Sequence, residues 1–224
     1  MSAVREEAQP AVRQRLTKDE RRERILDAAA QVFADRGYEP ATLDEIAEAA
    51  GISKPVIYDH FSSKKDLHIS LIESHGEALI AFMAERVGQS QGPAEALASG
   101  LGALLEFVER DPYAWRLLFQ EPSATDPEIV EAHRANQTNT TAALTAFAAA
   151  QPFEANADDP VEREVALELI AQMIKMSGAG VVTWWYEHRD VSREQLLEVM
   201  MSTLWIGLER LMGGERWKSE RPEA

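Results

Sequence analysis

The sequence predicts an all-α protein, with an N-terminal three-helix head followed by a larger helical body. Three observations support this fold class. Apolar residues recur at intervals of three and four, helix start and stop signals punctuate the chain, and no run alternates between apolar and polar residues as a strand would. The predicted parts are a disordered tail over 1–16, the head over 17–66, the body over 67–214 and a second tail over 215–224.

Composition narrows the class of protein. Of the 224 residues, 45% are hydrophobic and none is cysteine. This composition suits a packed globular protein in a reducing compartment, and it excludes a disulfide scaffold and a thiolate metal site. The first residues lack the apolar run of a signal peptide, and we find no stretch long and apolar enough to cross a membrane. The sequence therefore predicts a cytoplasmic protein with no membrane partner.

The negative charge of the chain is unevenly distributed. The formal net charge is −15, but residues 1–65 carry 11 Lys and Arg against 12 Asp and Glu, whereas residues 66–224 carry 12 against 26. An acidic body repels nucleic acid except at a locally neutral or basic face, which favours one docking orientation. The six basic residues between Arg13 and Arg24 form either a solvated helix face or an arm that contacts DNA.

The first helix of the head is predicted to run from Thr17 to Arg36. Thr17 and Glu20 have the spacing of a capping box, in which each side chain bonds the other's free backbone N–H. Gly37 ends the helix. Its apolar stripe, which must be buried against the following segment, consists of Ile25, Ala28, Ala29, Val32 and Phe33.

The next stretch predicts two short helices joined by a tight turn. Thr42 and Glu45 form a second capping box, and Gly51 ends the helix in the left-handed conformation that glycine tolerates. Ser53 is expected to cap the second short helix, with Pro55 in its first turn. Small residues where the helices touch, glycine at the turn and apolar residues beyond it are typical of a helix-turn-helix.

The second short helix exposes residues suited to reading DNA. It is too short to serve as a core element, and a helix of this kind presents its N-terminal residues to base edges in the major groove. The start of the following helix, with two lysines, suits a backbone phosphate. The alternative is that this polar set is the solvated face of an ordinary three-helix unit. The exposed residues are Lys54, Pro55, Val56, Tyr58, Asp59 and His60, and the lysines are Lys64 and Lys65.

The run from Thr17 to Leu67 resembles the TetR family of bacterial transcriptional regulators. The resemblance rests on RILDAAAQVFADRGYEPATLDEIAEAAGISKPVIYDHFSSKKDL and covers about 50 of the 224 residues. It implies a homodimeric, all-helical repressor that binds a palindromic operator in double-stranded DNA. It also implies a ligand pocket in the C-terminal domain, and release of the DNA when a small-molecule effector binds.

Carried over by position, the resemblance assigns roles within the head. The implied DNA-binding residues are Thr42 and Tyr58 at phosphates, Ser53, Lys54, Pro55, Val56 and His60 on the recognition helix, and Lys64 at a helix start. Two positions depart from the family pattern, because Val56 stands where a hydroxyl is frequent and Asp59 where an aromatic or basic residue often sits. Asp59 either accepts a hydrogen bond from a cytosine amino group or points away from the DNA.

Helix start signals divide the body into a series of predicted helices. Prolines at positions 93, 112, 127 and 160 stand at predicted helix starts, Ser192 with Gln195 starts the last helix, and Gly213-Gly214 ends it. A helix from Leu67 to about Val87 connects head and body.

The last two helices of the body are too apolar around their circumference for the surface of a monomer, which predicts a four-helix dimer interface. Small residues at 177–180 stand in the middle of the first of them, where each glycine costs up to about 1 kcal/mol relative to alanine. Close approach of another helix backbone would explain that cost. The predicted interface residues are Gly178, Val181, Val182, Trp185, Leu197, Leu204 and Trp205.

A ligand pocket in the body is predicted chiefly from the resemblance. Large apolar residues and methionines suit an adaptable site, although each one taken singly is more typical of an ordinary core. Gln137, Asn139 or Gln172 could orient a ligand within it. The predicted ligand-binding residues are Trp115, Phe119, Met173, Met176 and Trp184.

No motif predicts catalysis, a metal or a cofactor. The five histidines form no ligand pair at helical spacing with a supporting carboxylate, and there is no Gly-rich phosphate loop and no nucleophile with a nearby base. The sequence therefore predicts a non-enzymatic repressor that a small, largely apolar effector releases from DNA. The alternatives are an activator or effector-independent member of the family, and a helical enzyme or interaction protein with a vestigial head.

Overall fold

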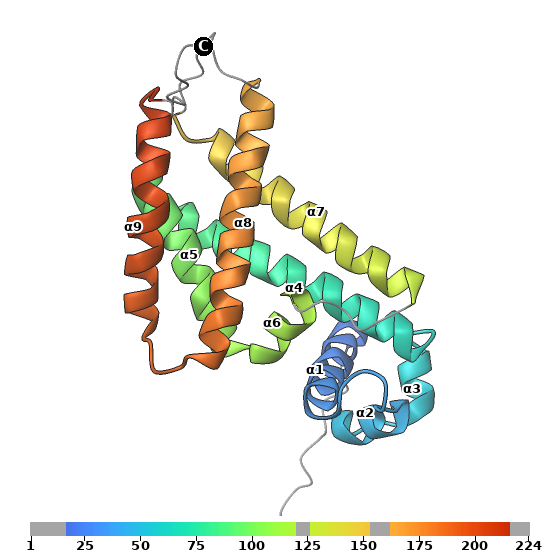
Figure 1. The fold of residues 1–224 in the computed structure, drawn as a ribbon. Helices are drawn as coiled ribbons and strands as arrows, with labels where there is room; N and C mark the ends of the chain where they lie inside the picture. The colour runs from blue at the N-terminus through green and yellow to red at the C-terminus, as the bar shows by residue number, and fades with distance from the viewer. Residues whose placement is uncertain (1–16, 120–125, 153–161, 216–224) are drawn as a thin grey trace, which may run out of the picture. The chain divides into compact units, whose positions relative to one another are not determined.

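The computed structural model describes residues 17–119, 126–152 and 162–215, and every regular element among them is a helix (Figure 1). The predicted all-α fold class is confirmed. The chain divides into two compact units, unit 1 (Met1–Leu67) and unit 2 (His68–Ala224). The predicted tail over 1–16 and nearly all of the tail over 215–224 lie outside the described residues.

Unit 1 is built from three helices and the start of a fourth. They are α1 (Lys18–Arg36), α2 (Leu43–Ala50), α3 (Lys54–Tyr58) and the first residues of α4 (Lys64–Val87). All four contribute apolar side chains to one core, and α1 packs closely on α2. The buried residues include Ile25, Ala28, Ala29, Phe33, Ile46, Ala47, Ala50, Ile57, Phe61 and Leu67. Of the predicted stripe on α1, only Val32 is half-buried rather than buried.

Most predicted start and stop signals of unit 1 are confirmed. Capping boxes start α1 at Thr17 and α2 at Thr42. Gly37 and Gly51 end these helices with φ of 82° and 64°, a region that other residues adopt only with strain. Ser53 is the N-cap residue of α3 as predicted, but its exposed hydroxyl makes no capping hydrogen bond.

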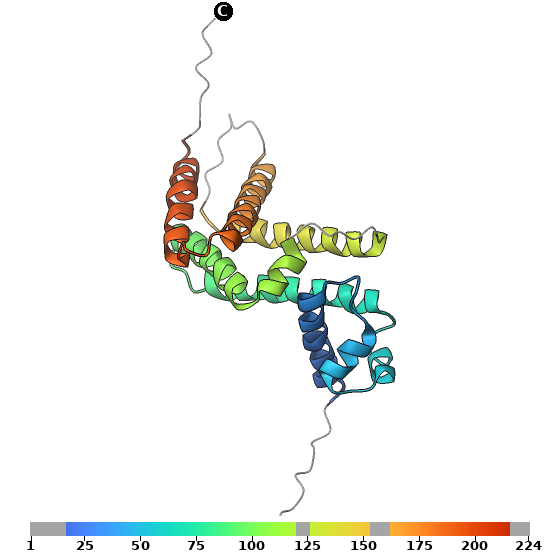
Figure 2. The ribbon, with the colours of Figure 1, turned by 60° about the horizontal axis from the view of Figure 1, so that its bottom comes forward.

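Unit 2 contains the rest of α4 and, among its described residues, five more helices. These are α5 (Pro93–Arg110), α6 (Pro112–Phe119), α7 (Pro127–Ala149), α8 (Arg163–Glu187) and α9 (Arg193–Met212). Three of the four proline starts are confirmed, and the fourth, at Pro160, lies outside the described residues. α7 packs along α8 and α5 along α9, while α8 and α9 form a hairpin (Figures 1 and 2).

The short connection between α8 and α9 is fixed at both ends. The indole N–H of Trp185 donates a hydrogen bond to the carbonyl of Val191 at 2.7 Å, and the guanidinium of Arg189 lies 4.8 Å from the centre of the indole ring. The predicted capping box of Ser192 and Gln195 starts α9. These contacts stabilise the loop end of the hairpin formed by α8 and α9.

α8 is more apolar than a single packing face requires. By length and composition alone it could cross a membrane, contrary to the sequence prediction. A core helix passes the same test, and one face of α8 does pack inside unit 2 through Leu167, Ala171, Gly178, Val182 and Trp185. The apolar residues on its other face are exposed, and they form part of the surface described below.

Candidate functional site

The exposed face of α3 gathers most of the predicted DNA-binding residues. Ile57 is fully buried and anchors this short helix in the core of unit 1, whereas Ser53, Pro55 and Tyr58 are exposed, Tyr58 at 52%. Lys54, Val56 and His60 are half-buried beside them. A short exposed helix held by one buried anchor is the arrangement with which helix-turn-helix proteins enter the major groove.

Thr42 lies at the start of α2, where its exposed hydroxyl takes part in the capping box. The hydroxyl accepts a hydrogen bond from the backbone N–H of Glu45 and lies 3.0 Å from a carboxylate oxygen of the same residue. Hydrogen bonds from the backbone N–H and hydroxyl of Thr42 lower the pKa of Glu45. The position suits a phosphate contact, since polar groups at helix starts contact phosphate oxygens in many protein–DNA complexes.

Lys54 is paired with an acid that sequence reasoning missed. Its ammonium donates a hydrogen bond to the Asp44 carboxylate of α2 at 2.9 Å, and this bond raises the pKa of Lys54. The side chain of Asp44 is 71% exposed. The only sequence signal for the pair is that Asp44 lies in the first turn of α2, and the turn between the helices brings it to Lys54.

Asp44→Asn is expected to strengthen DNA binding. The substitution removes a negative charge beside the predicted DNA-binding residues and frees the Lys54 ammonium for a phosphate, so the plot of log affinity against log salt should steepen by about 1. Anisotropy titrations with operator DNA at several salt concentrations measure both effects. The matched control is Asp35→Asn, which removes the same charge from an exposed position on α1. Equal effects of the two substitutions would contradict a role for the pair.

Lys64, predicted to contact a phosphate, makes structural contacts within unit 1. Its ammonium donates hydrogen bonds to the backbone carbonyls of Tyr38, Glu39 and Ala41 at 2.7, 2.9 and 3.1 Å. It also lies 4.5 Å from the centre of the Tyr38 ring. An ammonium has three protons, and all three are engaged. Lys64 therefore fixes the connection between α1 and α2.

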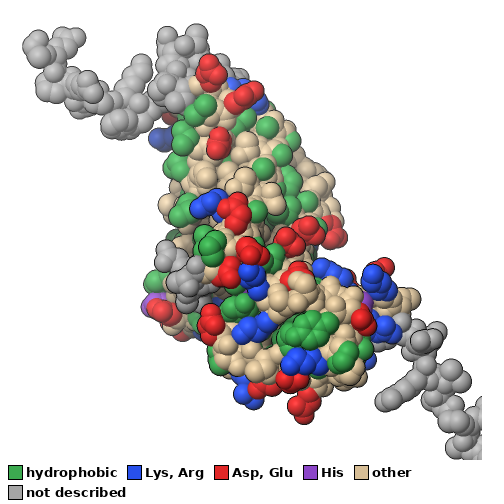
Figure 3. Space-filling view, turned by 90° about the vertical axis from the view of Figure 1, so that its right-hand side faces the viewer, with side chains coloured by type: hydrophobic (Ala, Val, Ile, Leu, Met, Phe, Trp, Pro, Cys, Tyr) green, Lys and Arg blue, Asp and Glu red, His purple; other side chains and the backbone are tan. Residues whose placement is uncertain are grey.

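Charged side chains of both signs are interspersed on the face drawn in Figure 3. Basic groups are scattered among acidic ones there, rather than gathered into one continuous patch.

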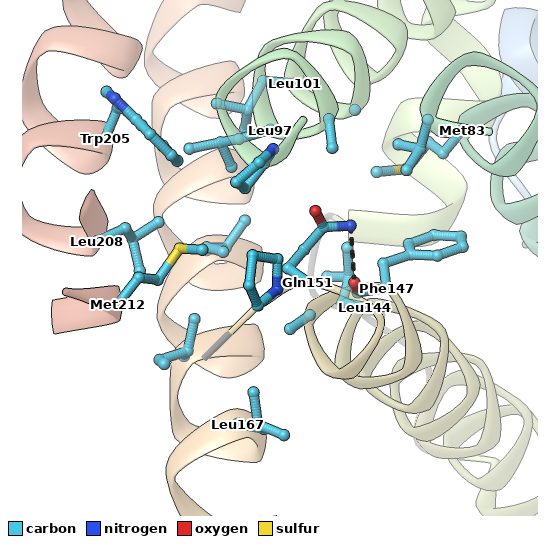
Figure 4. A pocket seen from close by; sticks show the side chains of 18 residues that line it. Met83, Leu97, Leu101, Leu144, Phe147, Gln151, Leu167, Trp205, Leu208 and Met212 are labelled. Carbon is cyan, nitrogen blue, oxygen red and sulfur yellow. Dashed lines mark hydrogen bonds between the residues drawn. The ribbon is translucent and has the colours of Figure 1, made fainter. Parts of the chain in front are cut away.

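Unit 2 contains an apolar cavity of about 110 Å³ (Figure 4). Five helices line it, with α9 opposite α4 in the view of Figure 4. The amide of Gln151 is the main polar group at the cavity and donates a hydrogen bond to the carbonyl of Phe147 at 3.4 Å. The lining includes Met83, Leu97, Leu101, Leu144, Phe147, Leu167, Trp205, Leu208 and Met212.

The five residues predicted to bind a ligand do not line this cavity. Trp115 is fully buried and stacks on Phe119 with the ring centres 4.3 Å apart, so these two belong to the packing of α6. Met173, Met176 and Trp184 lie on the surface of α8 and are 67%, 66% and 46% exposed. The physical reason for the correction is that α8 is apolar on more than one face, so its periodicity does not identify the inward one.

The structure places the residues predicted for the dimer interface in several different environments. Gly178, Val182 and Trp185 are buried within unit 2, and a Cβ added to Gly178 would lie 3.0 Å from the side chain of Leu104 on α5. The small residue thus serves packing within the chain. Trp205 lines the cavity and Leu204 a groove between α8 and α9, while Val181 and Leu197 are half-buried.

A different set of apolar residues is unpartnered on α8 and α9. We call it the exposed stripe, and on each helix its members recur at intervals of three, four, seven or eight residues, which places them on one face. The exposed stripe consists of Leu169, Met173, Met176 and Trp184 on α8 and Val199 and Ile206 on α9. Large apolar side chains exposed along one helix face are typical of an interaction site.

Within the part of the chain that the structure describes, no three His, Asp or Glu side chains are grouped so that they could hold a metal ion. The candidate features are thus the predicted DNA-binding residues of unit 1 and, in unit 2, the apolar cavity and the exposed stripe.

Comparison with known proteins matches both units. The family of bacterial regulatory proteins described as the tetR family matches residues 25–71. The transcriptional activator FasR of Mycolicibacterium smegmatis is 31% identical over 198 residues, which cover 88% of this chain and 87% of FasR.

Two solved structures share the fold over most of the chain. FadR of Bacillus subtilis in complex with stearoyl-CoA has a TM-score of 0.67 and 22% identity, over 87% of this chain and 99% of that one. AibR in complex with isovaleryl coenzyme A and operator DNA has a TM-score of 0.60 and 23% identity, over 82% and 97%. The likeness to FasR extends through the helix-turn-helix and the helical body alike, and the chain belongs to the TetR family of bacterial transcriptional regulators.

Proposed function

We propose that this regulator is a homodimer that binds a palindromic operator and loses affinity for it when a long apolar ligand enters the cavity of unit 2. The cavity is the observation that carries the proposal. Its lining is almost wholly apolar and includes the flexible side chains of Met83 and Met212, which adapt to ligands of different shape.

The size of the cavity supports a ligand-driven change. Its volume of about 110 Å³ is smaller than the roughly 150 Å³ of an engineered cavity that binds benzene. A longer ligand must displace lining side chains, and it therefore binds an expanded state of unit 2 more tightly than the state described here. A ligand with such a preference shifts the population toward the expanded state.

α4 is the proposed route from ligand to DNA. Lys64 at its start bonds three carbonyls of unit 1, whereas Met83 and Val87 near its end line the cavity. In a dimer, displacement of the end of α4 changes the spacing of the two DNA-binding faces, which must match half-sites about 34–36 Å apart or a multiple of this. A tenfold loss of affinity requires a preference of about 1.4 kcal/mol for the non-binding spacing.

The exposed stripe supports the homodimer. Large apolar side chains such as Leu169, Met173 and Met176 are 52–67% exposed, and a second copy of the same hairpin of α8 and α9 would cover them. This assignment keeps the predicted pair of helices and replaces all seven residues predicted on them.

The solved relatives support an acyl ligand. The FadR structure contains stearoyl-CoA, and the AibR structure contains isovaleryl coenzyme A together with operator DNA. The apolar lining of the cavity suits the chain of such a molecule. We propose acyl compounds as the effector class, and the cytoplasm, where DNA and acyl-CoA meet, as the site of action.

Activation of transcription is the second candidate, because FasR, a relative that covers 88% of this chain, is an activator. Loss of DNA binding has opposite consequences in the two cases. Deleting the gene raises transcription from a repressed promoter and lowers it from an activated one. A reporter placed behind the operator therefore separates the predicted repressor from an activator.

Ala148→Leu is expected to leave DNA binding intact and to weaken the response to ligand at least tenfold. Ala148 lines the cavity, and the added carbons fill space that the ligand needs. The operator is first selected from a random DNA pool with the wild-type protein, and stearoyl-CoA is then titrated into the complex. Ala135→Leu, at an exposed position of α7 outside the cavity, is the matched control. An unchanged response in Ala148→Leu, or no response of the wild type to stearoyl-CoA or stearate, refutes the proposal.

A further inference from the structure

We propose that a polar groove between α7 and α8 binds the anionic head of an amphipathic ligand whose apolar chain lies in the cavity, with Lys175 as the principal contact. The inference rests on the proposed function, since the chain of the ligand occupies the cavity described above. The groove has a volume of about 770 Å³, and its polar lining includes Gln137, Thr141, Thr145, Arg163, Gln172 and Lys175.

Lys175 is a half-buried cation whose hydrogen-bond partners are neutral. Its ammonium donates to the hydroxyl of Thr141 at 2.6 Å and to the carbonyl of Gln137 at 3.3 Å. Among the described residues, no carboxylate is paired with it. Burial lowers the pKa of Lys175, as expected where a charge is desolvated without a counter-ion. One of its three protons remains for an entering anion.

The charge of the groove differs from that of the body around it. Residues 66–224 carry 12 Lys and Arg against 26 Asp and Glu. Arg134 and Arg163 line the groove together with Lys175, against the carboxylates of Glu164 and Glu168. Arg134 is already paired with Glu131 at 2.8 Å. Lys175 and Arg163 are therefore the cations that an anion would meet, and the acidic surroundings confine its binding to this place.

A buried hydroxyl in the groove also lacks a partner. Thr145 lies one turn beyond Thr141 on the same face of α7, and its hydroxyl is buried without a hydrogen-bond partner among the described residues. A buried polar atom of this kind costs free energy unless a bond is supplied. An oxygen-rich head group in the groove would supply one.

The groove and the cavity meet at Leu167, whose side chain lines both. On each of the two helices, one residue faces the cavity and the residue after it faces the groove. Leu144 faces the cavity and Thr145 the groove, and Ile174 faces the cavity and Lys175 the groove. α7 and α8 therefore form a wall with one apolar and one polar side. Leu167 is 3% exposed, so a ligand chain that displaces it would reach both sides, and Lys175 lies about 12 Å farther along α8.

The chemistry of the head follows from these groups. An ammonium with a neighbouring hydroxyl binds anionic oxygens, which a fatty acid presents as a carboxylate and an acyl-CoA as phosphates. A neutral alcohol with the same chain lacks this charge. Comparing the three compounds at one chain length therefore isolates the contribution of the head.

The test is isothermal titration calorimetry of the full chain with dodecanoate, dodecanoyl-CoA and dodecanol. The wild type should bind at least one anionic compound ten or more times as tightly as dodecanol. Lys175→Gln should lose that advantage and bind dodecanol as before, whereas Lys175→Arg should retain most of it. The matched control is Arg110→Gln, which removes a charge paired with Glu106 on α5 and should change nothing. A loss confined to dodecanoate identifies a carboxylate, and one confined to dodecanoyl-CoA identifies phosphates.

Arg163→Gln provides a second variant at the exposed start of α8, about 18 Å from Lys175 along the helix, and should weaken binding of dodecanoyl-CoA, whose several phosphates can reach both cations, at least threefold. Equal wild-type affinity for dodecanol and both anions, or unchanged affinities in Lys175→Gln and Arg163→Gln, overturns the inference while the apolar ligand of the proposed function stands. If none of the three compounds binds the wild type, the inference and the proposed effector class fail together.

Discussion

Replacing Met173 and Met176 together with glutamate should convert the protein to a monomer that no longer holds its operator. Both side chains belong to the exposed stripe, at 67% and 66% exposure, so the folded chain tolerates charge at these positions. In the proposed dimer the same carboxylates would be buried against an apolar partner, at a cost of several kcal/mol each. Losing bivalent engagement of two half-sites then lowers DNA affinity by a further factor of about 10²–10⁴.

Light scattering gives the oligomeric state of this double variant, and a gel shift at moderate salt gives its affinity for the operator. Val130→Glu places a carboxylate on another exposed apolar residue, on α7 outside the stripe, and should remain dimeric. A monomeric wild type, or a double variant that is still a stable dimer, contradicts the assignment of the stripe.

Lys64→Met should destabilise unit 1 by about 3 kcal/mol. Hydrogen bonds to charged groups each contribute about 1.5–3 kcal/mol without being additive, and the substitution leaves the carbonyls of Tyr38, Glu39 and Ala41 without this donor. Such a loss is a large part of the usual 5–15 kcal/mol stability of a domain. The variant should therefore bind less DNA because less of it is folded.

Chemical denaturation followed by circular dichroism measures the change in stability of Lys64→Met, and Lys18→Met, at an exposed lysine of α1, is the control. Where the variant is still folded, the dependence of its DNA affinity on salt should be that of the wild type. An unchanged denaturation midpoint with a salt dependence shallower by about 1 would instead restore Lys64 to a phosphate.

The head was predictable from sequence because its signals are local. Capping boxes at Thr17 and Thr42 and the glycines at 37 and 51 act within four residues of their partners, and each lies where the spacing predicts it. The structural contacts of Lys64 could not be predicted in this way, because its partners are backbone carbonyls 23–26 residues away. Carbonyls leave no mark in a sequence, so a lysine at a helix start looks the same whether it meets a phosphate or its own chain.

The helices of the body were predictable from sequence, but which side of each helix is buried was not. Val182 and Met176 both belong to an apolar α8, and only the packing of α5 and α7 determines that the first is buried and the second exposed. The cavity is lined by residues as far apart in the sequence as Met83 and Met212. No local sequence pattern indicates that these two residues line the same cavity. Lys175 carried a signal that could have been read, since it and Lys218 are the only lysines after residue 66.

The position of the boundary between the units suggests where this protein can be recombined. The division falls after Leu67, inside α4, so Lys64 and the three carbonyls it bonds all lie on the N-terminal side of that point. A chimaera joined between Leu67 and His68 therefore keeps unit 1 together with the hydrogen bonds of Lys64 that stabilise it. A chimaera whose junction lies before Lys64 loses these hydrogen bonds. Sensors that pair this body with a foreign recognition module are therefore best joined within the helix rather than in the loop that precedes it.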